Sequence, residues 1–240
     1  MLQIALETIG KSGSLAVLDQ ETVVWQRSFG DDRRTAAVLA VHLDAAVRWC
    51  EDQQQAIQWV SVAVGPGSFT GLRIGITTAK TLAYAMHLPT VPVGSLAAIA
   101  AAIEPAPEIA RILVGLNAYR GQVFAAEFDT ATLRDIAPPA TAAFSVEVLS
   151  RDQWNQRVSS TAGSVASDGG VALAGDLSII PSEWTGLFQA PQPNTAVGVG
   201  RIANRLVERQ SPSCSAQIDP FSLSARYVKL SAAEEQAASR

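Results

Sequence analysis

Apolar and polar positions in the first thirty residues occur in short blocks and do not follow a helical period. Runs of apolar and β-branched residues at 2–8, 14–19 and 22–29 are separated by the stretch IGKSG at 9–13 and by an acidic turn at 19–21. Short runs of this kind between turn-forming residues are typical of strands joined in a meander. We therefore predict that the chain begins with three consecutive strands.

The period changes to that of a helix over residues 34–51. One apolar stripe of this helix comprises Leu39, Leu43, Ala46, Val47 and Cys50, and a second comprises Val38, Val41, Ala45 and Trp49. A helix that packs only on its own core needs one apolar stripe. Two stripes indicate two packing partners.

Strands and helices alternate in the next fifty residues. The run WVSVAV at 59–64 has the composition of a buried strand, and the glycine-rich turn after it opens a helix that ends at about Met86. A strand at 90–94 and a helix at 95–103 are expected to follow. This order resembles half of an actin-like or ribonuclease-H-like domain, in which helices pack on a mixed sheet.

Strand-like runs recur after the segment EPAPE at 104–108, whose prolines are poor helix interior. The runs at 111–118, 121–129 and 132–137 suggest a second, abbreviated copy of the same architecture. We therefore predict an α/β, two-lobed actin-like fold (the ASKHA, ribonuclease-H-like class), with mixed sheets flanked by helices. The boundary between the lobes is placed at residue 104.

The last eighty residues carry fewer signals. A small polar loop is expected at 159–170 and a helix at 195–208. The predicted division is an N-terminal lobe with dimerisation helices at 1–104, a C-terminal lobe at 105–230 and a flexible tail at 231–240.

Composition narrows the function classes. The 240 residues are 48% hydrophobic and carry 18 basic against 22 acidic residues, a net charge of −4 without a block of like charges. This is the composition of a globular protein, without the basic footprint of a protein that grips nucleic acid. Any contact with RNA is expected to be indirect.

Candidate metal ligands and membrane segments are scarce. Cys50, Cys214, His42 and His87 are too few and too far apart for a disulfide framework or a histidine-rich metal site. The start of the chain lacks the pattern of a signal peptide, and the longest apolar run, at 88–103, is short and interrupted by prolines. We expect a cytoplasmic protein with no metal, no cofactor and no membrane segment.

The turn VGPGSFTGLRIG at 64–75 matches no cofactor motif. A phosphate loop would need lysine after Gly71, where the chain has Leu72, and a dinucleotide fingerprint would need a third glycine where the chain has Thr70. A nucleophile elbow would need glycine two residues to either side of Ser68. No catalytic residue is predicted here.

Two interpretations of the turn remain from its residue types. Backbone N–H groups at the start of the helix could bind an anion, helped by the helix dipole. Alternatively, Ser68 or Thr70 caps the helix while the glycines permit close packing. Glu7, at the end of the first strand, stands where actin-like ATPases hold a carboxylate for magnesium; a surface carboxylate without a ligand is the simpler interpretation.

The helix after the turn has three distinct faces. Small residues at Gly71, Gly75 and Thr78 share one side, Leu72, Ile76, Ala79 and Ala83 form an apolar stripe, and Arg73, Lys80 and Tyr84 share another face. The small residues would let another backbone come close. The third face is either a solvated basic face or part of a contact surface.

The segment GPGSFTGLRIG, continued by TTAKTLAYAMHLPTVPVGSL, resembles the signature region of the TsaB family. The signature turn comprises Gly65, Pro66, Gly67, Ser68, Phe69 and Thr70. LNAYRGQVFAAEF resembles the family's Asp-Ala-Arg-x-Gly-Glu-Val-Tyr segment, and DPFSLSARYVKL resembles its C-terminal Pro-x-Tyr-x-Arg segment. The resemblance covers most of the chain in the expected order.

Five positions depart from the family pattern. Glu7 precedes Thr8 where the family has Asp-Thr, and Arg34 stands where many members have histidine. Asn117 and Tyr119 replace the usual aspartate and arginine, and Ser222 replaces the C-terminal tyrosine. These differences weaken residue-level comparison in the second half and leave the family resemblance intact.

The resemblance implies a non-catalytic scaffold subunit, a pseudo-enzyme, in tRNA processing. Its partner TsaD would transfer the threonylcarbamoyl group to the adenosine beside the anticodon, and TsaE would supply ATP hydrolysis. The chain would form a homodimer when alone and would meet tRNA only through the complex. A stand-alone actin-like ATPase or peptidase is the alternative.

The subunit interface is predicted on the first two helices. It comprises Val38, Val41, Ala45 and Trp49 with Gly71, Arg73 and Gly75. Trp49→Asp, or Gly75→Leu, which would force two backbones apart, is expected to abolish pairing without entering the core.

Overall fold

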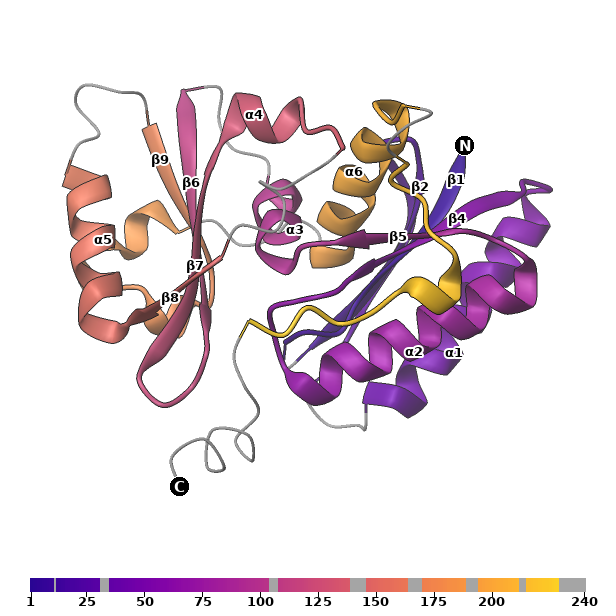
Figure 1. The fold of residues 1–240 in the computed structure, drawn as a ribbon, viewed down its shortest axis with the longest axis horizontal. Coiled ribbons are helices and arrows are strands. Elements are labelled where there is room, and N and C mark those ends of the chain that lie inside the picture. Colours follow the sequence, from indigo (N-terminus) through magenta and orange to yellow (C-terminus); the bar gives the residue numbers. More distant parts are fainter. Residues whose placement is uncertain are drawn as a thin grey trace.

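The computed structural model describes residues 1–10, 12–30, 35–103, 108–138, 146–163, 170–188, 194–211 and 215–228. They form two sheets, each flanked by helices, with α3 and α6 between them (Figure 1). The predicted two-lobed α/β fold with mixed sheets is therefore confirmed.

The first sheet has the strand order β3-β2-β1-β4-β5. Its strands are β1 (Leu2–Glu7), β2 (Gly13–Asp19), β3 (Thr22–Phe29), β4 (Ile57–Ala63) and β5 (Thr90–Val93). The first three pair antiparallel, as the predicted meander requires, whereas β4 pairs parallel to both β1 and β5. Parallel pairing needs a crossover, and the helix between β4 and β5 supplies it.

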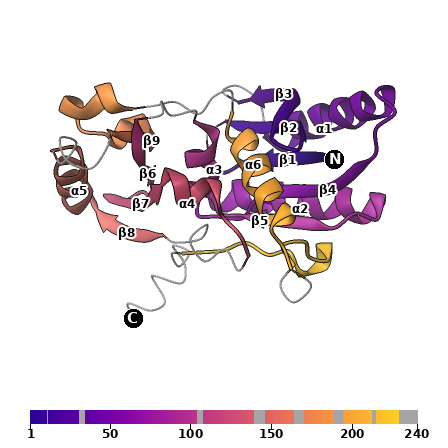
Figure 2. The same ribbon diagram turned by 90° about the horizontal axis from the view of Figure 1, so that it is seen from above.

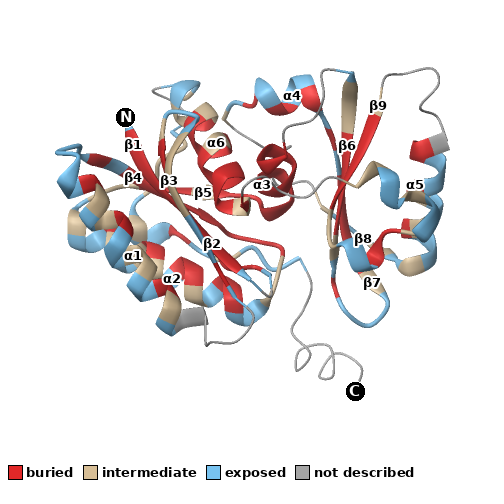
Figure 3. Cartoon of the chain, turned by 180° about the vertical axis from the view of Figure 1, so that it is seen from behind, coloured by how far each residue is buried: buried red, intermediate tan, exposed pale blue. Residues whose placement is uncertain are grey.

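Helices cover both faces of the first sheet. The helices α1 (Thr35–Asp52) and α2 (Phe69–Met86) lie on one face, and α6 (Thr195–Glu208) packs on the other (Figure 1). All three agree with the predicted helical segments. The side of α1 and α2 that faces away from the sheet carries exposed residues (Figure 3).

The helix α3 (Ser95–Ala102) is buried along its whole length (Figure 3). It contacts α6 as well as strands of the second sheet. An all-round apolar helix is stable only inside a core, and alanine gives α3 the small side chains that this site demands. At its contact with α6, a Cβ added to Gly198 would lie 1.8 Å from the carbonyl oxygen of Ala98, so only glycine fits there.

The second sheet has the order β8-β7-β6-β9. Its strands are β6 (Ile109–Asn117), β7 (Gln122–Asp129), β8 (Glu147–Ser150) and β9 (Gly170–Gly175). The helix α5 (Arg151–Gly163) packs on β7 and β8, and α4 (Thr130–Arg134) packs on β6 and β7. A separate apolar core around the buried Trp154 joins α5 to this sheet.

Two local predictions in the second half are wrong. The run at 132–137 is not a strand, because the carboxylate of Asp129 accepts a hydrogen bond from the backbone N–H of Thr132 at 2.8 Å and caps α4. Residues 159–163 of the expected polar loop belong to α5, and 164–169 lie outside the described residues. The expected tail at 231–240 also lies outside them.

The chain returns to the first sheet after β9. The helix α6 contacts β1 and β2, and residues 215–228, which include the 3₁₀ turn Pro220–Ser222, run beside β5 and α2 (Figures 1 and 2). Thr90 and Ile218 exchange backbone hydrogen bonds of 2.9 and 2.8 Å. The division into two lobes at residue 104 stays a prediction. Residues 195–208, which come after this division in the sequence, pack on the first sheet.

Candidate subunit interface

The signature turn begins α2 by capping it. The Ser68 hydroxyl oxygen accepts a hydrogen bond from the backbone N–H of Gly71 at 3.2 Å, while Thr70 is exposed. A serine in this position satisfies one of the free N–H groups of the first helical turn. Of the two interpretations of the turn, the structure supports the capping one.

Two glycines of α2, Gly71 and Gly75, pack against the end of β1 in the same chain. A Cβ added to Gly71 would lie 1.9 Å from the carbonyl oxygen of Thr8, and one added to Gly75 would lie 2.4 Å from the Thr8 hydroxyl oxygen. That hydroxyl donates a 2.7 Å hydrogen bond to the Gly71 carbonyl. The close backbone that these small residues admit is therefore the chain's own.

The burial of Gly71 and Gly75 corrects the prediction that they belong to the subunit interface. Gly71 and Gly75 are both buried, so neither offers an open surface to a second subunit. The idea that Gly75→Leu would stay out of the core is wrong, because a larger side chain there would collide with Thr8. The interface itself stays a prediction for the other five residues.

The turn also holds the C-terminal segment. Gly65 has a φ of +126°, and a Cβ at this position would lie 2.4 Å from the carbonyl oxygen of Arg226. The backbone N–H of Arg226 donates a 2.7 Å hydrogen bond to the Val64 carbonyl. The described part of the C-terminal segment, 219–228, thus meets the segment 65–75 in space at this point.

The second apolar stripe of α1 divides into two parts. Val41, 67% exposed, and Ala45 lie on the surface, while Val38 and Trp49 are half-buried and pack against the first core. The first stripe faces the sheet, with Leu39, Ala46 and Cys50 buried. An apolar surface therefore continues outward from the core on α1.

Arg73 lies on the outer face of α2 among aromatic rings. Its guanidinium carbon is 3.9 Å from the centre of the Phe69 ring, and its Nε lies 3.4 Å from the Tyr227 hydroxyl oxygen. Phe69 and Tyr227 contact each other at a centroid distance of 5.0 Å. A guanidinium over a ring gains a cation–π interaction, which holds Arg73 in place.

A second aromatic pair lies further along α2. Tyr84 and Phe221 meet edge to face at 5.3 Å, and the Lys80 ammonium donates to the Phe221 carbonyl at 3.4 Å. The face predicted as either solvated or part of a contact is thus partly covered by residues 215–228. The sequence analysis did not include Phe221 and Tyr227 in the predicted interface, although aromatic residues, which are enriched at binding surfaces, were the available signal.

Glu7 is buried, not at the surface. It is 5% exposed, and its carboxylate accepts hydrogen bonds from the Ile9 N–H and from the Ser14 hydroxyl at 3.2 Å. The Ser14 oxygen in turn accepts a 3.0 Å bond from the Ala196 N–H at the start of α6. Burial raises the pKa of Glu7 to about 7, against the opposing effect of these hydrogen bonds. The carboxyl therefore links β1, β2 and α6.

The other departures from the family pattern lie at scattered positions. The Asn117 N–H donates to Asp176 at 2.9 Å, and its side-chain oxygen accepts from the Tyr119 N–H at 2.8 Å. Tyr119 is exposed with a φ of 59°. Ser222 ends the short turn at 220–222, and Arg34 lies outside the described residues.

Both histidines contact or end elements of the fold. His42 stacks on Phe29 with ring centres 5.6 Å apart, and His87 ends α2 in the left-handed conformation. Within the described part of the chain, no three His, Cys, Asp or Glu residues are close enough to hold a metal ion together.

None of the described helices combines the length and the apolar character needed to cross a membrane. Cys214 lies outside the described residues.

Comparison with known proteins adds a family. A family model described as "TsaD: tRNA N6-adenosine threonylcarbamoyltransferase" matches residues 32–166, more than half of the chain. The "tRNA threonylcarbamoyladenosine biosynthesis protein TsaB" of Bacillus subtilis (strain 168) is 35% identical over 103 residues, which span 42% of this chain and 44% of that protein. Its Escherichia coli (strain K12) namesake is 41% identical over 64 residues, which span 27% and 28%. The aligned part is thus less than half the length of either relative.

The fold is similar to a solved structure over nearly the whole chain. "YeaZ from Pseudomonas aeruginosa" aligns with a TM-score of 0.66 at 18% identity, covering 95% of this chain and 99% of that one. At this identity the likeness concerns the fold. The solved structure therefore supports the two-lobed fold of this chain.

Proposed function

The chain belongs to the family described as TsaD: tRNA N6-adenosine threonylcarbamoyltransferase, as a TsaB/YeaZ-type member, and from this premise we propose that it serves the biosynthesis of threonylcarbamoyladenosine in tRNA. We further propose that it acts in the cytoplasm as a non-catalytic subunit that supports TsaD. TsaE joins the working complex, and the chain pairs with itself when TsaD is absent.

The exposed apolar surface of α1 carries the pairing proposal. Val41 and Ala45 lie in water beside half-buried Val38 and Trp49, so a partner could bury apolar area without rearranging the core. Burial of apolar surface contributes about 25 cal/mol per Å², against which ordering and association costs count. Arg73 and the rings around it supply the residue types enriched at binding hot spots.

The surroundings of Glu7 support the non-catalytic part. Its carboxylate, at the position where actin-like ATPases hold magnesium, is bonded to the N–H of Ile9 and the hydroxyl of Ser14 and is almost fully buried. The carboxylate oxygens thus already accept hydrogen bonds from groups of the protein itself, and burial removes them from solvent. We therefore assign Glu7 a structural role.

Reconstitution tests the proposed activity. TsaD, TsaE, tRNA and threonylcarbamoyl-adenylate are combined with and without this chain, and modified adenosine is measured over several turnovers. We expect multiple turnover only when the chain is present. Equal modification without it, or sustained ATP or peptide hydrolysis by the chain alone that a point mutation abolishes, would contradict the proposal.

A matched pair of variants tests the surface. Val41→Glu places a charge on the exposed stripe of α1, and Leu177→Glu places the same charge at an exposed apolar residue of the second lobe, 52% exposed. We expect the first variant to lose pairing with TsaD and the second to keep it, both with unchanged circular dichroism. Wild-type pairing by folded Val41→Glu would show that the interface lies elsewhere.

A further inference from the structure

A cavity of about 280 Å³ lies where the two lobes meet. Its walls come from α3, α6 and the turn between β2 and β3 on the side of the first sheet, and from α4 and β6 on the other side. Ile103 and Leu133 contribute apolar wall, and the charged groups are Glu21, Arg134 and one face of α6. A concave site of mixed character that joins two lobes is a common form of ligand site.

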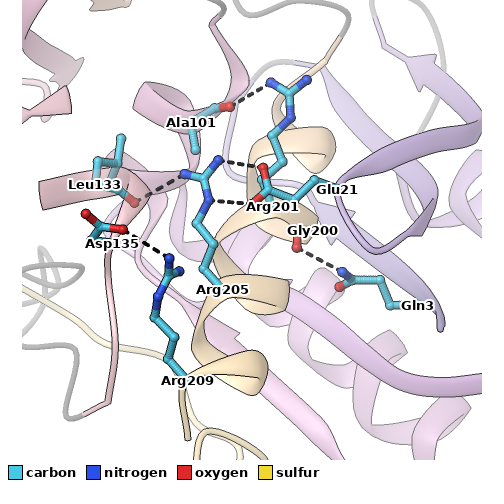
Figure 4. A network of polar contacts seen from close by, with 9 residues as sticks. All are labelled: Gln3, Glu21, Ala101, Leu133, Asp135, Gly200, Arg201, Arg205 and Arg209. Atoms are coloured by element: carbon cyan, nitrogen blue, oxygen red, sulfur yellow. Dashed lines mark hydrogen bonds and ion pairs between the residues drawn. The ribbon is translucent and has the colours of Figure 1, made fainter. Parts of the chain in front are cut away.

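The arginines of α6 project from one face of that helix. Arg201, Arg205 and Arg209 are spaced four residues apart, so their side chains stack along the same side (Figure 4). Arg201 donates to the Ala101 carbonyl at 3.0 Å, and Arg209 pairs with Asp135 at 3.1 Å. The row therefore contacts α3 at one end and the residue that follows α4 at the other.

Arg205 lies at the centre of the row. It binds both carboxylate oxygens of Glu21, at 2.8 and 2.6 Å, and donates to the Leu133 carbonyl at 3.2 Å. Its side chain is only 11% exposed, which places a charged guanidinium inside the cavity wall. Among the described residues that line the cavity, Glu21 is the single acidic one.

Basic side chains outnumber acidic ones in the part of the lining that the structure describes. Arg134, Arg201 and Arg205 face one carboxylate, Glu21, and Arg134 forms no ion pair or side-chain hydrogen bond with any residue that the structure describes. Burial would raise the pKa of Glu21, but the hydrogen bonds and charge of Arg205 and the charges of Arg201 and Arg209 lower it below its ordinary value. The surroundings of the cavity therefore favour negative charge.

The cavity is separate from the end of the sheets that holds Glu7. Glu7 lies at the end of β1, next to the turn that leads into β2, whereas Glu21 lies after the other end of β2. In the second sheet, Thr130 follows the end of β7, away from the turn at 118–121 where β7 begins. A ligand in this cavity would therefore not compete with the contacts of Glu7.

We propose that this cavity binds a small phosphomonoester, with the phosphate between Arg134, Arg201 and Arg205. Such a phosphate carries about −1.5 to −2 charges at pH 7, opposite in sign to the guanidinium groups of the lining. The planar guanidinium fork fits phosphate oxygens two at a time. Ile103 and Leu133 would contact the organic part of the ligand.

The site would also couple the two lobes. The phosphate would contact α6, which packs on the first sheet, and α4, which packs on the second. A ligand that binds only the folded protein stabilises it by mass action. Binding is therefore expected to raise the melting temperature of the chain.

Calorimetric titration and thermal melting with glycerol 3-phosphate, inorganic phosphate and succinate test the proposal. We expect saturable binding of glycerol 3-phosphate, weaker binding of inorganic phosphate and the weakest of succinate. Arg134→Gln should weaken the affinity about tenfold or more, because it removes a charged donor that has no structural partner. Glu21→Gln should strengthen the affinity, because it removes the competing carboxylate and releases the fork of Arg205.

A matched control separates a site from general electrostatics. Arg157→Gln removes an arginine that pairs with Glu147 at 3.1 Å, away from the cavity lining, and should bind like the wild type. Circular dichroism of Arg134→Gln should be unchanged, because that side chain is exposed and unpaired within the described structure. The absence of saturable phosphate binding, a preference for succinate, or equal losses in Arg134→Gln and Arg157→Gln would each overturn the proposal.

Discussion

The inner and outer sides of the α1–α2 layer differ in what they tolerate. On the inner side, Gly71 and Gly75 meet Thr8 with no space for a further atom. On the outer side, Val41 and Ala45 contact water, and Arg73 and Phe69 lie over one another without being enclosed. The signature region, 65–75, contributes residues to both sides.

This difference separates two roles that one short segment combines. The inner residues join α2 to the end of β1 and to the C-terminal segment, so they decide whether the first lobe folds. Under the proposed function, the exposed outer residues contribute to assembly more than to folding. Variants on the inner side should therefore change stability, whereas variants on the outer side should change assembly.

The largest expected effect is that of Gly71→Ala. The added methyl group would lie 1.9 Å from a backbone oxygen, so either α2 or the end of β1 must shift. We expect a loss of about 3 kcal/mol or more in the free energy of unfolding, measured by chemical denaturation. Gly186→Ala is the matched control, since its added Cβ would meet no described atom within 4 Å beyond its own chain neighbours. Similar stability of the two variants would refute the close packing at Gly71.

Glu7→Gln should change the pH dependence of stability at the same junction. The Glu7 carboxyl has a pKa of about 7 in the folded protein and 4.5 in the unfolded chain, so between these values the folded protein binds more protons. Its protonation therefore stabilises the fold fully below pH 4.5, and this stabilisation is lost as the pH rises to 7. The loss amounts to about 3 kcal/mol at most for that shift. The glutamine variant should lack this loss.

Denaturation of the wild type and of Glu7→Gln at pH 5 and pH 8 measures this effect. The variant should be the more stable protein at pH 8, and the difference should shrink at pH 5. Identical pH profiles would show that Glu7 does not titrate in this range.

Trp49→Ala lies between the two extremes. The ring packs against the first core and is half-buried, so its removal is expected to cost about 1–2 kcal/mol, less than the loss of a fully buried tryptophan. It should also weaken pairing, because Trp49 belongs to the same stripe of α1 as the exposed Val41. Denaturation together with light scattering of the purified variant measures both effects, and a loss as large as that of Gly71→Ala would place Trp49 in the core instead.

The smallest effect on stability is expected for Val41→Asn. Its side chain is 67% exposed, so the free energy of unfolding should change by less than about 0.5 kcal/mol. Pairing with TsaD, followed by light scattering, should weaken all the same. A substantial loss of stability in the isolated chain would show that this position supports the fold and not an interface.

Much of the fold could be predicted from the sequence. The strands at 2–29 and the helices α1, α2, α3 and α6 produce clear periods, since each has an apolar face of regular spacing or a buried composition. The helix α4 was missed because a single capping contact from Asp129 outweighs the β-like composition of five residues. Short segments depend on such contacts more than on their own propensities.

The candidate site was less predictable. The pattern placed Val38, Val41, Ala45 and Trp49 on one stripe of α1, and it could not separate the exposed Val41 and Ala45 from the half-buried Val38 and Trp49. The sequence did not connect Phe221 and Tyr227 with α2. Their partners on that helix, Tyr84 and Phe69, lie far away along the chain. Contacts at such separation leave no local pattern.

The sequence by itself determined the family, the order of the elements and the presence of an extra apolar stripe on α1, because each follows from local spacing or from a distinctive segment. Only the tertiary structure decided which backbone approaches Gly71 and Gly75, that Glu7 is buried, and that the arginines of α6 line a cavity beside Glu21 and Arg134. The physical reason is the same in all three cases. Close contact, desolvation and the sum of several charges are properties of residues that the fold brings together from distant parts of the chain.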